Sequence, residues 1–230
     1  MPLRGGATAR LGRMLEQLDR GGLPIHVTPV AREMLTRMAG ALPALRGIVV
    51  RQLLRPAIAR AALPRMGDQA RMTSAMLRNT VSPTIIETSK KFNVIPSEIE
   101  VTLDGRILPG FEPDDLVREV RALIGDDVEV EVQLYDPGPS EIDLGMFATL
   151  AGILEQADPG GVATPLLMPG VTDGRFFSRL GIQTYGFLPM RLAEDFNFWQ
   201  TVHAADERIP VEAVSFGAEA IHTALKRFGE

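Results

Sequence analysis

Apolar side chains recur at helical spacing through the N-terminal third of the chain, as at Leu11, Met14, Leu15 and Leu18. Glycine, proline and capping residues then divide this third into separate segments. The pattern predicts four helices: 7–20, which ends at Gly21-Gly22; a helix opened by Thr28-Pro29 that ends near Gly40; 44–62, with a kink at Pro56; and 67–78, which Asp68 caps.

Beyond residue 80 the pattern changes from helical to alternating. Thr84–Ser89 is β-branched, and both Glu98–Asp104 and Asp127–Leu134 alternate polar with apolar residues, which is typical of half-buried strands. Pro113 opens a helix to about Ile124. One more strand before residue 1 would complete a ferredoxin-like β-α-β-β-α-β unit. We therefore expect the chain to begin inside a domain.

Asp136-Pro137-Gly138-Pro139 is the best candidate for a linker. The residues that follow it predict alternating helices and strands, and hence an α/β fold class for the chain. The predicted elements are a helix at 141–157, a strand at 162–168, a helix from Thr172, a strand at 182–188 and a helix at 210–228.

Composition narrows the function classes. The 230 residues are 45% hydrophobic and 23% charged, as in ordinary globular proteins, and the net charge of −5 disfavours a dedicated nucleic-acid binder. The absence of cysteine excludes disulfides and thiolate chemistry. No segment has the length and apolar character of a membrane span or a signal region. We therefore expect a cytoplasmic protein that has neither a nucleic acid nor a membrane as its partner.

Three places could carry chemistry. His203 precedes Asp206 and Glu207, either of which could orient a metal-bound imidazole, although a surface loop feeding a helix fits equally. The segment Thr172-Asp173-Gly174 follows a strand and opens a helix, where backbone N–H groups suit an anion or act simply as a cap. Arg106 follows an alternating strand and could bind a carboxylate, or be a solvated surface residue.

The remaining candidates have simpler interpretations from the residues alone. Asn93 fits a turn, and His26 and His222 are interpreted as structural. The methionines of the helical third are interpreted as core residues.

Four segments, taken in order, resemble the family of dinuclear zinc hydrolases that contains aminoacylases, carnosinases, acetylornithine deacetylases and glutamate carboxypeptidases, peptidase family M20. They are Asn93-Val94-Ile95-Pro96, Asp104-Gly105-Arg106-Ile107-Leu108-Pro109-Gly110, Val171-Thr172-Asp173-Gly174-Arg175-Phe176, and His203-Ala204-Ala205-Asp206-Glu207-Arg208. The resemblance implies a lid and dimerisation domain over 1–137, with a helical insertion at about 22–78. It also implies the C-terminal part of a zinc-binding α/β catalytic domain over 138–230.

The resemblance also implies roles for individual residues. His203 matches the terminal zinc ligand of an enzyme that holds two zinc ions. Asn93 matches a lid residue that reaches the active site of the partner subunit in a homodimer. Arg106 matches the residue that binds the substrate carboxylate, and Thr172, Asp173 and Gly174 match the loop beside it. The family's His-x-Asp motif, its Glu-Glu pair with the general base and its other acidic ligand have no match here.

Three hypotheses follow. The first is a fragment of a zinc-dependent hydrolase that cleaves an amide or peptide bond in a small carboxylate-bearing substrate, either an N-acyl amino acid or a dipeptide. The second is a catalytically inactive dimerisation module of the same family. The third, an unrelated ferredoxin-like regulatory domain, explains the alternating strands but not the segments around Asp173 and His203. One candidate zinc ligand cannot form a catalytic site, so we expect this chain alone to be inactive.

Overall fold

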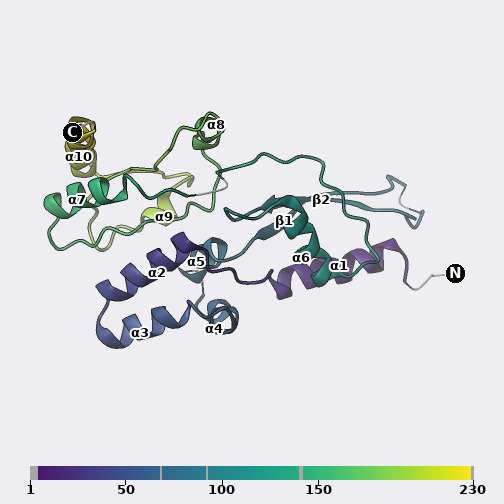
Figure 1. Ribbon diagram of the computed structural model, residues 1–230. Coiled ribbons are helices and arrows are strands. Elements are labelled where there is room, and N and C mark those ends of the chain that lie inside the picture. The colour runs from purple at the N-terminus through teal and green to yellow at the C-terminus, as the bar shows by residue number, and fades with distance from the viewer. Residues whose placement is uncertain (1–4, 68, 92, 140–141, 229–230) are drawn as a thin grey trace. The chain divides into compact units, whose positions relative to one another are not determined.

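The computed structural model describes residues 5–67, 69–91, 93–139 and 142–228 (Figure 1). The chain forms two compact units. The first comprises Met1–Ile142 and Leu166–Arg175, and the second comprises Asp143–Pro165 and Phe176–Glu230. The fold combines many helices with a small antiparallel sheet and is of the expected mixed α/β kind. The predicted domain boundary at 137/138 stays a prediction.

The first unit contains a two-stranded antiparallel sheet, which is formed by β1 (Thr80–Glu87) and β2 (Glu100–Arg106). Thr80 lies opposite Arg106, and the register shifts between Pro83 and Ile85. Proline has no N–H to donate to a ladder, and a bulge accommodates it. The strand predicted at 84–89 therefore begins earlier, at Thr80, and continues through the proline.

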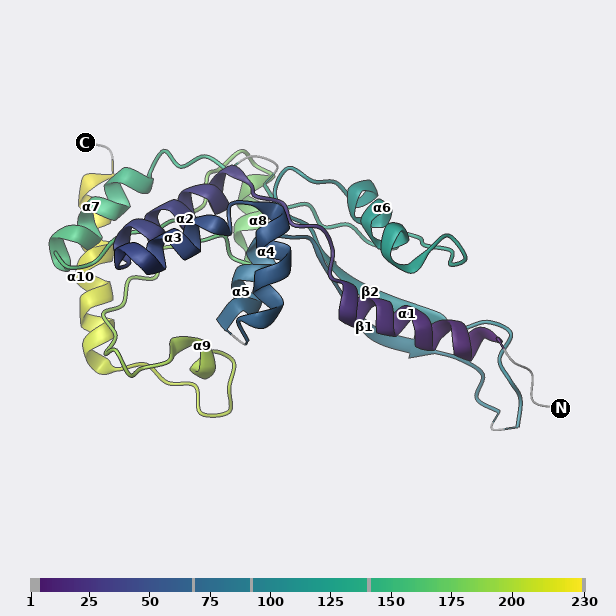
Figure 2. The same cartoon turned by 90° about the horizontal axis from the view of Figure 1, so that it is seen from below.

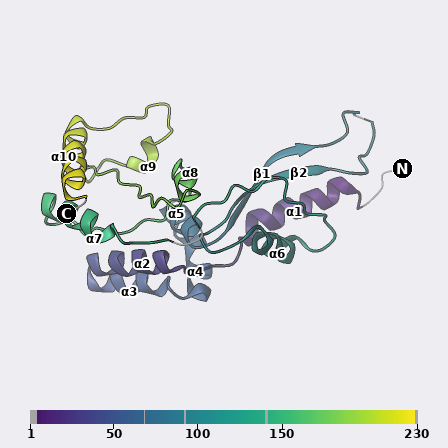
Figure 3. The same cartoon turned by 45° about the horizontal axis from the view of Figure 1, so that its top comes forward.

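One face of this sheet is covered by α1 (Ala7–Gly21) and α6 (Pro113–Ile124), which Figure 3 shows on the same side of the two strands. Apolar residues at helical spacing on both helices pack against the alternating apolar residues of the strands. Each of the two patterns therefore marks the side of its element that is buried. The buried residues of this sheet core are Met14, Leu23, Val120 and Ile124, with Val81, Val101 and Leu103 packed against them.

A second core lies among the helices of residues 22–78, the segment expected to be a helical insertion, and Figure 2 shows these helices beyond one end of the sheet. The predicted helix at 44–62 is two helices, because Pro56 cannot donate to the preceding turn and its ring disfavours a helical Arg55. The helices are α2 (Pro29–Ala41), α3 (Ala44–Gln52), α4 (Pro56–Ala62), the short 3-10 helix η1 (Leu63–Arg65) and α5 (Gln69–Met76). Asp68, the predicted cap of the last helix, lies outside the described residues.

The strand predicted at Asp127–Leu134 is not formed, although its side chains alternate as expected. Val128 and Val130 pack against the sheet core, while Glu129 and Glu131 are exposed. A strand also needs a backbone ladder with a neighbour, and neither described strand forms one with this segment. Its contact with β2 is through side chains, as where Gln133 Nε2 donates to Glu100 Oε1 at 3.3 Å. The alternation of Asp127–Leu134 therefore predicted the buried face correctly, but it could not predict whether a strand would pair with the segment.

In the second unit, α7 (Phe147–Ala157) packs against α10 (Val211–Arg227). Gly217 of α10 lies so close to the backbone that a Cβ there would be 2.7 Å from the carbonyl oxygen of Pro189. The segments 162–168 and 182–188 are not strands, because neither finds a ladder partner among the described residues. Tyr185 instead donates its hydroxyl to the carbonyl of Asp143 at 3.0 Å. The short helices α8 (Gly174–Ser178) and α9 (Phe198–Thr201) complete the described elements.

Among the described residues, no helix is both long and apolar enough to cross a bilayer.

Helix α6 begins with a reciprocal cap that makes the stability of the first unit depend on pH. The backbone N–H of Glu112 donates to Asp115 Oδ2 at 2.9 Å, and Arg118 donates to Asp115 Oδ1 at 3.0 Å. The backbone hydrogen bond, followed by the bond from Arg118, lowers the pKa of Asp115 below its usual range. The folded state therefore gains stability above the unfolded pKa and loses it as pH falls through the lowered value.

We expect Asp115→Asn to lower the melting temperature of the first unit at neutral pH, and the difference from the wild type to shrink as pH falls below about 4. Thermal unfolding followed by circular dichroism at stepped pH measures this. Asp114→Asn is the matched control, because Asp114 lies in the same first turn without the bond to Glu112. A constant difference between Asp115→Asn and the wild type at every pH would contradict the cap's role.

Candidate functional site

Arg106 is the last residue of β2, where the strand leaves the sheet. Its Nε lies 3.0 Å from Asp104 Oδ2, and both side chains are about half-exposed. Residues two apart on a strand share a face, so this ion pair holds the guanidinium along the strand. Arg106 is thus accessible and oriented, as a residue that binds a carboxylate must be.

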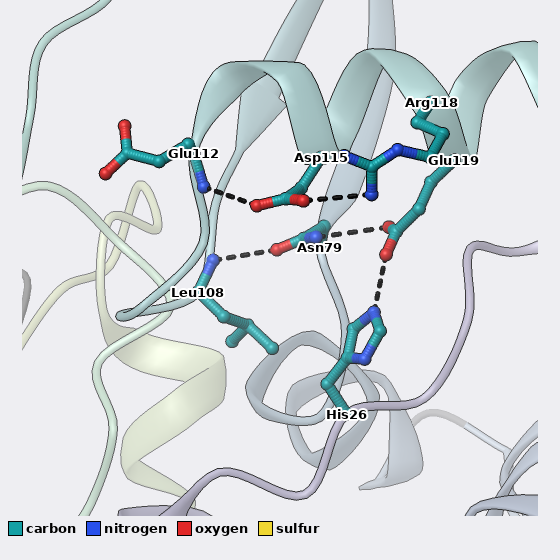
Figure 4. A network of polar contacts seen from close by, with 7 residues as sticks. All are labelled: His26, Asn79, Leu108, Glu112, Asp115, Arg118 and Glu119. Carbon is teal, nitrogen blue, oxygen red and sulfur yellow. Dashed lines mark hydrogen bonds and ion pairs between the residues drawn. The ribbon is translucent and has the colours of Figure 1, made fainter.

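The chain directly after Arg106 is fixed by a buried amide. Asn79, the residue before β1, has no exposed surface, and its Oδ1 accepts a hydrogen bond from the backbone N–H of Leu108 at 2.8 Å (Figure 4). The Asn79 Nδ2 group donates to Glu119 Oε2 at 3.1 Å. Asn79 therefore ties the start of one strand to the end of the other and to α6.

Glu119 uses its second oxygen for His26, as Figure 4 shows. The Glu119 Oε1 and His26 Nε2 atoms are 2.5 Å apart. A ring nitrogen that carries hydrogen is the donor in such a pair, and the carboxylate oxygen is the acceptor. The His26 ring also lies against Phe111, with ring centroids 4.4 Å apart, and its backbone N–H donates to the carbonyl of Leu77 at 2.6 Å. We name His26, Asn79, Leu108 and Glu119 the hinge network.

The hinge network connects parts of the chain that are distant in sequence. His26 comes from the segment between α1 and α2, and Asn79 from the end of the helical insertion. Glu119 is 93 residues from His26 and 40 from Asn79. The sequence offered no local pattern that could reveal these pairs. The interpretation of His26 as structural fits its place in the network.

Asn93 lies far from Arg106 on the β1–β2 hairpin. It is exposed and falls in the loop between the two strands, whereas Arg106 is at the other end of β2, opposite Thr80. The length of β2 alone separates the two ends by roughly 20 Å at about 3.3 Å per residue. Asn93 and Arg106 of one chain are therefore not brought together at one site.

The segment Thr172-Asp173-Gly174 belongs to the same unit as Arg106. Gly174 begins α8, a helix of only five residues, which offers little of the aligned backbone dipole expected for an anion site. Arg175 Nε pairs with Asp136 Oδ2 at 2.8 Å and ties this segment to the predicted linker. Within the described residues, no hydrogen bond or ion pair joins 172–174 to Arg106.

His203 lies in the second unit, is exposed, and has a φ of 59°. This left-handed conformation is uncommon for a residue with a side chain. Asp206, one of the two carboxylates expected to orient His203, instead accepts a hydrogen bond from Arg208, which lowers the pKa of Asp206. The expectation that Asp206 serves His203 is therefore not met.

The described residues do not make a metal site. No three histidine, aspartate or glutamate side chains gather among them, and the sequence has no cysteine. A catalytic zinc typically takes three protein ligands and one water. His203 does not by itself fit the expected zinc centre, and we derive no metal-dependent step from it.

Comparison with known proteins decides the family. A model of the peptidase dimerisation domain, M20_dimer, matches residues 4–131. The chain belongs to the M20 peptidase family. The resemblance drawn from the four sequence segments is thereby confirmed. The match includes Arg106, Asn93 and all four residues of the hinge network.

Curated M20 relatives are similar over much of the chain. A probable carboxypeptidase S-like 2 of Dictyostelium discoideum is 30% identical over 142 residues, which is 60% of this chain and 27% of the relative. The N-fatty-acyl-amino acid synthase/hydrolase PM20D1 of Homo sapiens is 29% identical over 158 residues, 66% of this chain and 31% of the relative. The Xenopus tropicalis protein of the same name is 30% identical over 158 residues, 66% and 30%.

The chain thus spans less than a third of the length of these M20 relatives. No solved structure matches it.

The hinge network predicts a specific loss of stability. Asn79→Ala leaves the Leu108 N–H and one Glu119 oxygen without a partner, so we expect the free energy of unfolding of the first unit to fall by about 2–4 kcal/mol. Asn93→Ala, the matched control in the same unit, removes an exposed amide and should cost less than about 0.5 kcal/mol. Denaturant unfolding measures both. Equal losses for the two variants would mean that the network does not hold this unit together.

Proposed function

We propose that this chain forms the dimerisation and carboxylate-binding part of an M20 hydrolase that cleaves the amide bond of an N-acyl amino acid or a dipeptide. This proposal rests on the position of Arg106 at the end of β2, within the matched dimerisation domain. Its half-exposed guanidinium is oriented by Asp104, and the chain after it is fixed by Asn79.

The relatives' names support this substrate class. An N-fatty-acyl-amino acid carries a free carboxylate next to the amide, and a carboxypeptidase acts beside the terminal carboxylate of its substrate. A guanidinium recognises such a group through two parallel hydrogen bonds. Within the described residues, the Asp104 contact uses only Nε of Arg106, so the terminal nitrogens are available to a ligand.

The proposal includes a homodimer. Asn93 and Arg106 lie at opposite ends of the β1–β2 hairpin, so one chain's hairpin can serve two active sites if Asn93 reaches that of the partner subunit. Thr172, Asp173 and Gly174 are proposed to line the carboxylate site in the complete enzyme. Separately, His203 of the second unit is proposed as a zinc ligand of the complete enzyme, a role that its left-handed backbone supports, because strained conformations cluster at functional sites.

A second candidate function is a dimerisation module without activity of its own. The observation that favours it is the lack of a gathered metal-ligand set among the described residues. Both candidates predict that the purified chain alone is inactive. They differ only when another polypeptide segment supplies the missing metal ligands, because the first candidate then predicts hydrolysis and the second does not. Hydrolysis of N-acyl amino acids by this chain alone, dependent on zinc and abolished by His203→Ala, would contradict both.

The substrate proposal is tested where this chain is joined to the family's other metal-binding segments. Charge-assisted hydrogen bonds contribute roughly 1.5–3 kcal/mol, so Arg106→Ala should lower kcat/KM for an N-acyl amino acid by about 10- to 150-fold. Arg106→Lys should restore little, since it keeps the charge but loses the paired donors. The matched substrate in which the carboxylate is an amide should lose little more on mutation. Equal losses on acid and amide would show that Arg106 supports the fold without binding the carboxylate.

A further inference from the structure

Charge is concentrated in one part of the helical insertion. Residues 29–66, which contain α2, α3, α4 and η1, hold seven arginines and one glutamate, with no lysine or aspartate, for a formal charge of +6. The whole chain has a net charge of −5. We call residues 29–66 the arginine-rich hairpin. Its single carboxylate, that of Glu33, already forms an ion pair with Arg37 at 2.6 Å.

The packing of α3 determines which of its sides is exposed. Gly47 faces α2, where a Cβ would lie 2.3 Å from the carbonyl oxygen of Ala39, and Val50 packs against the core of the insertion. Figure 1 shows α3 running alongside α2. The opposite side holds residues at positions i, i+3 and i+4, which share one helical face. These are Leu45, Ile48 and Val49, with exposed fractions of 81%, 56% and 62%.

Arginines border this exposed apolar face. At 3.6 residues per turn, Arg46 and Arg51 fall on its two edges, between the exposed and the packed sides of α3. Both are exposed, and neither forms an ion pair within the described part of the chain. Helix α3 therefore presents a short apolar ridge with a cation on each flank.

Two other groups of exposed apolar residues, on β1 and on α10, have different surroundings. Ile85 and Ile86 of β1 lie beside Glu87 and Glu100, which are paired across the sheet. The exposed aliphatic residues of α10 share that helix with both acidic and basic side chains. Unlike these two groups, the apolar ridge of α3 is flanked by cations that form no ion pair among the described residues.

We propose that the arginine-rich hairpin docks on the surface of an anionic lipid bilayer. Leu45, Ile48 and Val49 enter the boundary between headgroups and acyl chains, and Arg46 and Arg51 bind lipid phosphates and carboxylates at the headgroup level. Long basic side chains suit this position, because their stems lie along apolar surface while their heads stay hydrated. A second copy of the chain is a poorer occupant, since it would place two strongly cationic hairpins face to face.

This inference goes beyond the proposed function, because it concerns where the protein works and not which bond it cleaves. It also departs from the expectation that the protein has no membrane partner. That expectation considered only segments that span a bilayer, whereas the hairpin would lie on its surface.

The test is co-sedimentation of the 230-residue chain with vesicles of phosphatidylcholine, with and without added phosphatidylserine. We expect binding to the anionic vesicles that weakens as salt rises, and little binding to the neutral ones. Arg46→Gln with Arg51→Gln should lower the partition coefficient by about 30-fold. Leu45→Ser with Ile48→Ser and Val49→Ser should lower it by about 10-fold or more. All five positions are outside the buried core, and circular dichroism checks that each variant is folded.

Two control variants make the same kinds of substitution on other helices. Val211→Ser with Val214→Ser and Leu225→Ser removes three exposed aliphatic residues from α10, and Arg10→Gln with Arg13→Gln removes two exposed arginines from α1. Both should bind within about twofold of the wild type. The proposal is overturned if the wild type ignores anionic vesicles, if it binds both vesicle types equally, or if the controls lose as much as the α3 variants. It is also overturned if the ridge variant only converts a dimer to a monomer.

Discussion

The stability of the first unit of this M20 chain depends on the two hydrogen bonds of the fully buried Asn79 side-chain amide. A buried amide that lacks partners is costly, and here both ends are used: Oδ1 for the Leu108 N–H and Nδ2 for Glu119. Through these two bonds, the start of β1 is fixed to the chain that leaves β2. Glu119 then extends the constraint to His26 at the entrance of the helical insertion.

The consequence for function lies at Arg106. The guanidinium is half-exposed and, among the described residues, Asp104 is its ion-pair partner, so its direction also depends on how firmly the backbone beneath it is held. Leu108, two residues later, supplies that firmness because its side chain is buried and its N–H is bonded to Asn79. The proposed carboxylate site thus combines an exposed guanidinium, oriented by Asp104, with a backbone that a buried hydrogen bond holds in place, an arrangement that favours specific binding.

The sequence predicted the elements whose information is local. Apolar residues at helical spacing predicted α1, the Thr28-Pro29 pair predicted the start of α2, Pro113 predicted the start of α6, and Pro56 marked the division between α3 and α4. The alternation at Asp127–Leu134 gave the correct buried face, yet no strand forms, since strand formation depends on a neighbour that the segment itself does not encode. The strand predicted from Thr84 extends back through Pro83 to Thr80, because the bulge that accommodates the proline is set by the pairing with β2.

The site was predicted only in part. Arg106 and Asn93 were proposed through their resemblance to family segments; both lie within the matched dimerisation domain, and their roles stay predictions. Asn79 and Glu119 were missed, because the partners of each are brought together by folding over tens of residues. Either Asp206 or Glu207 was expected to orient His203, and in the structure Asp206 is bonded to Arg208, two residues beyond it.

Amide hydrogen exchange at Leu108, followed by NMR, tests the central claim most directly. If Asn79 holds the end of β2, the Leu108 amide should exchange about as slowly as the best protected amides of the first unit. In Asn79→Ala it should exchange much faster, by about the factor that corresponds to the lost stability or more. Rapid exchange at Leu108 in the wild type, similar to that of the exposed loop around Asn93, would contradict the account.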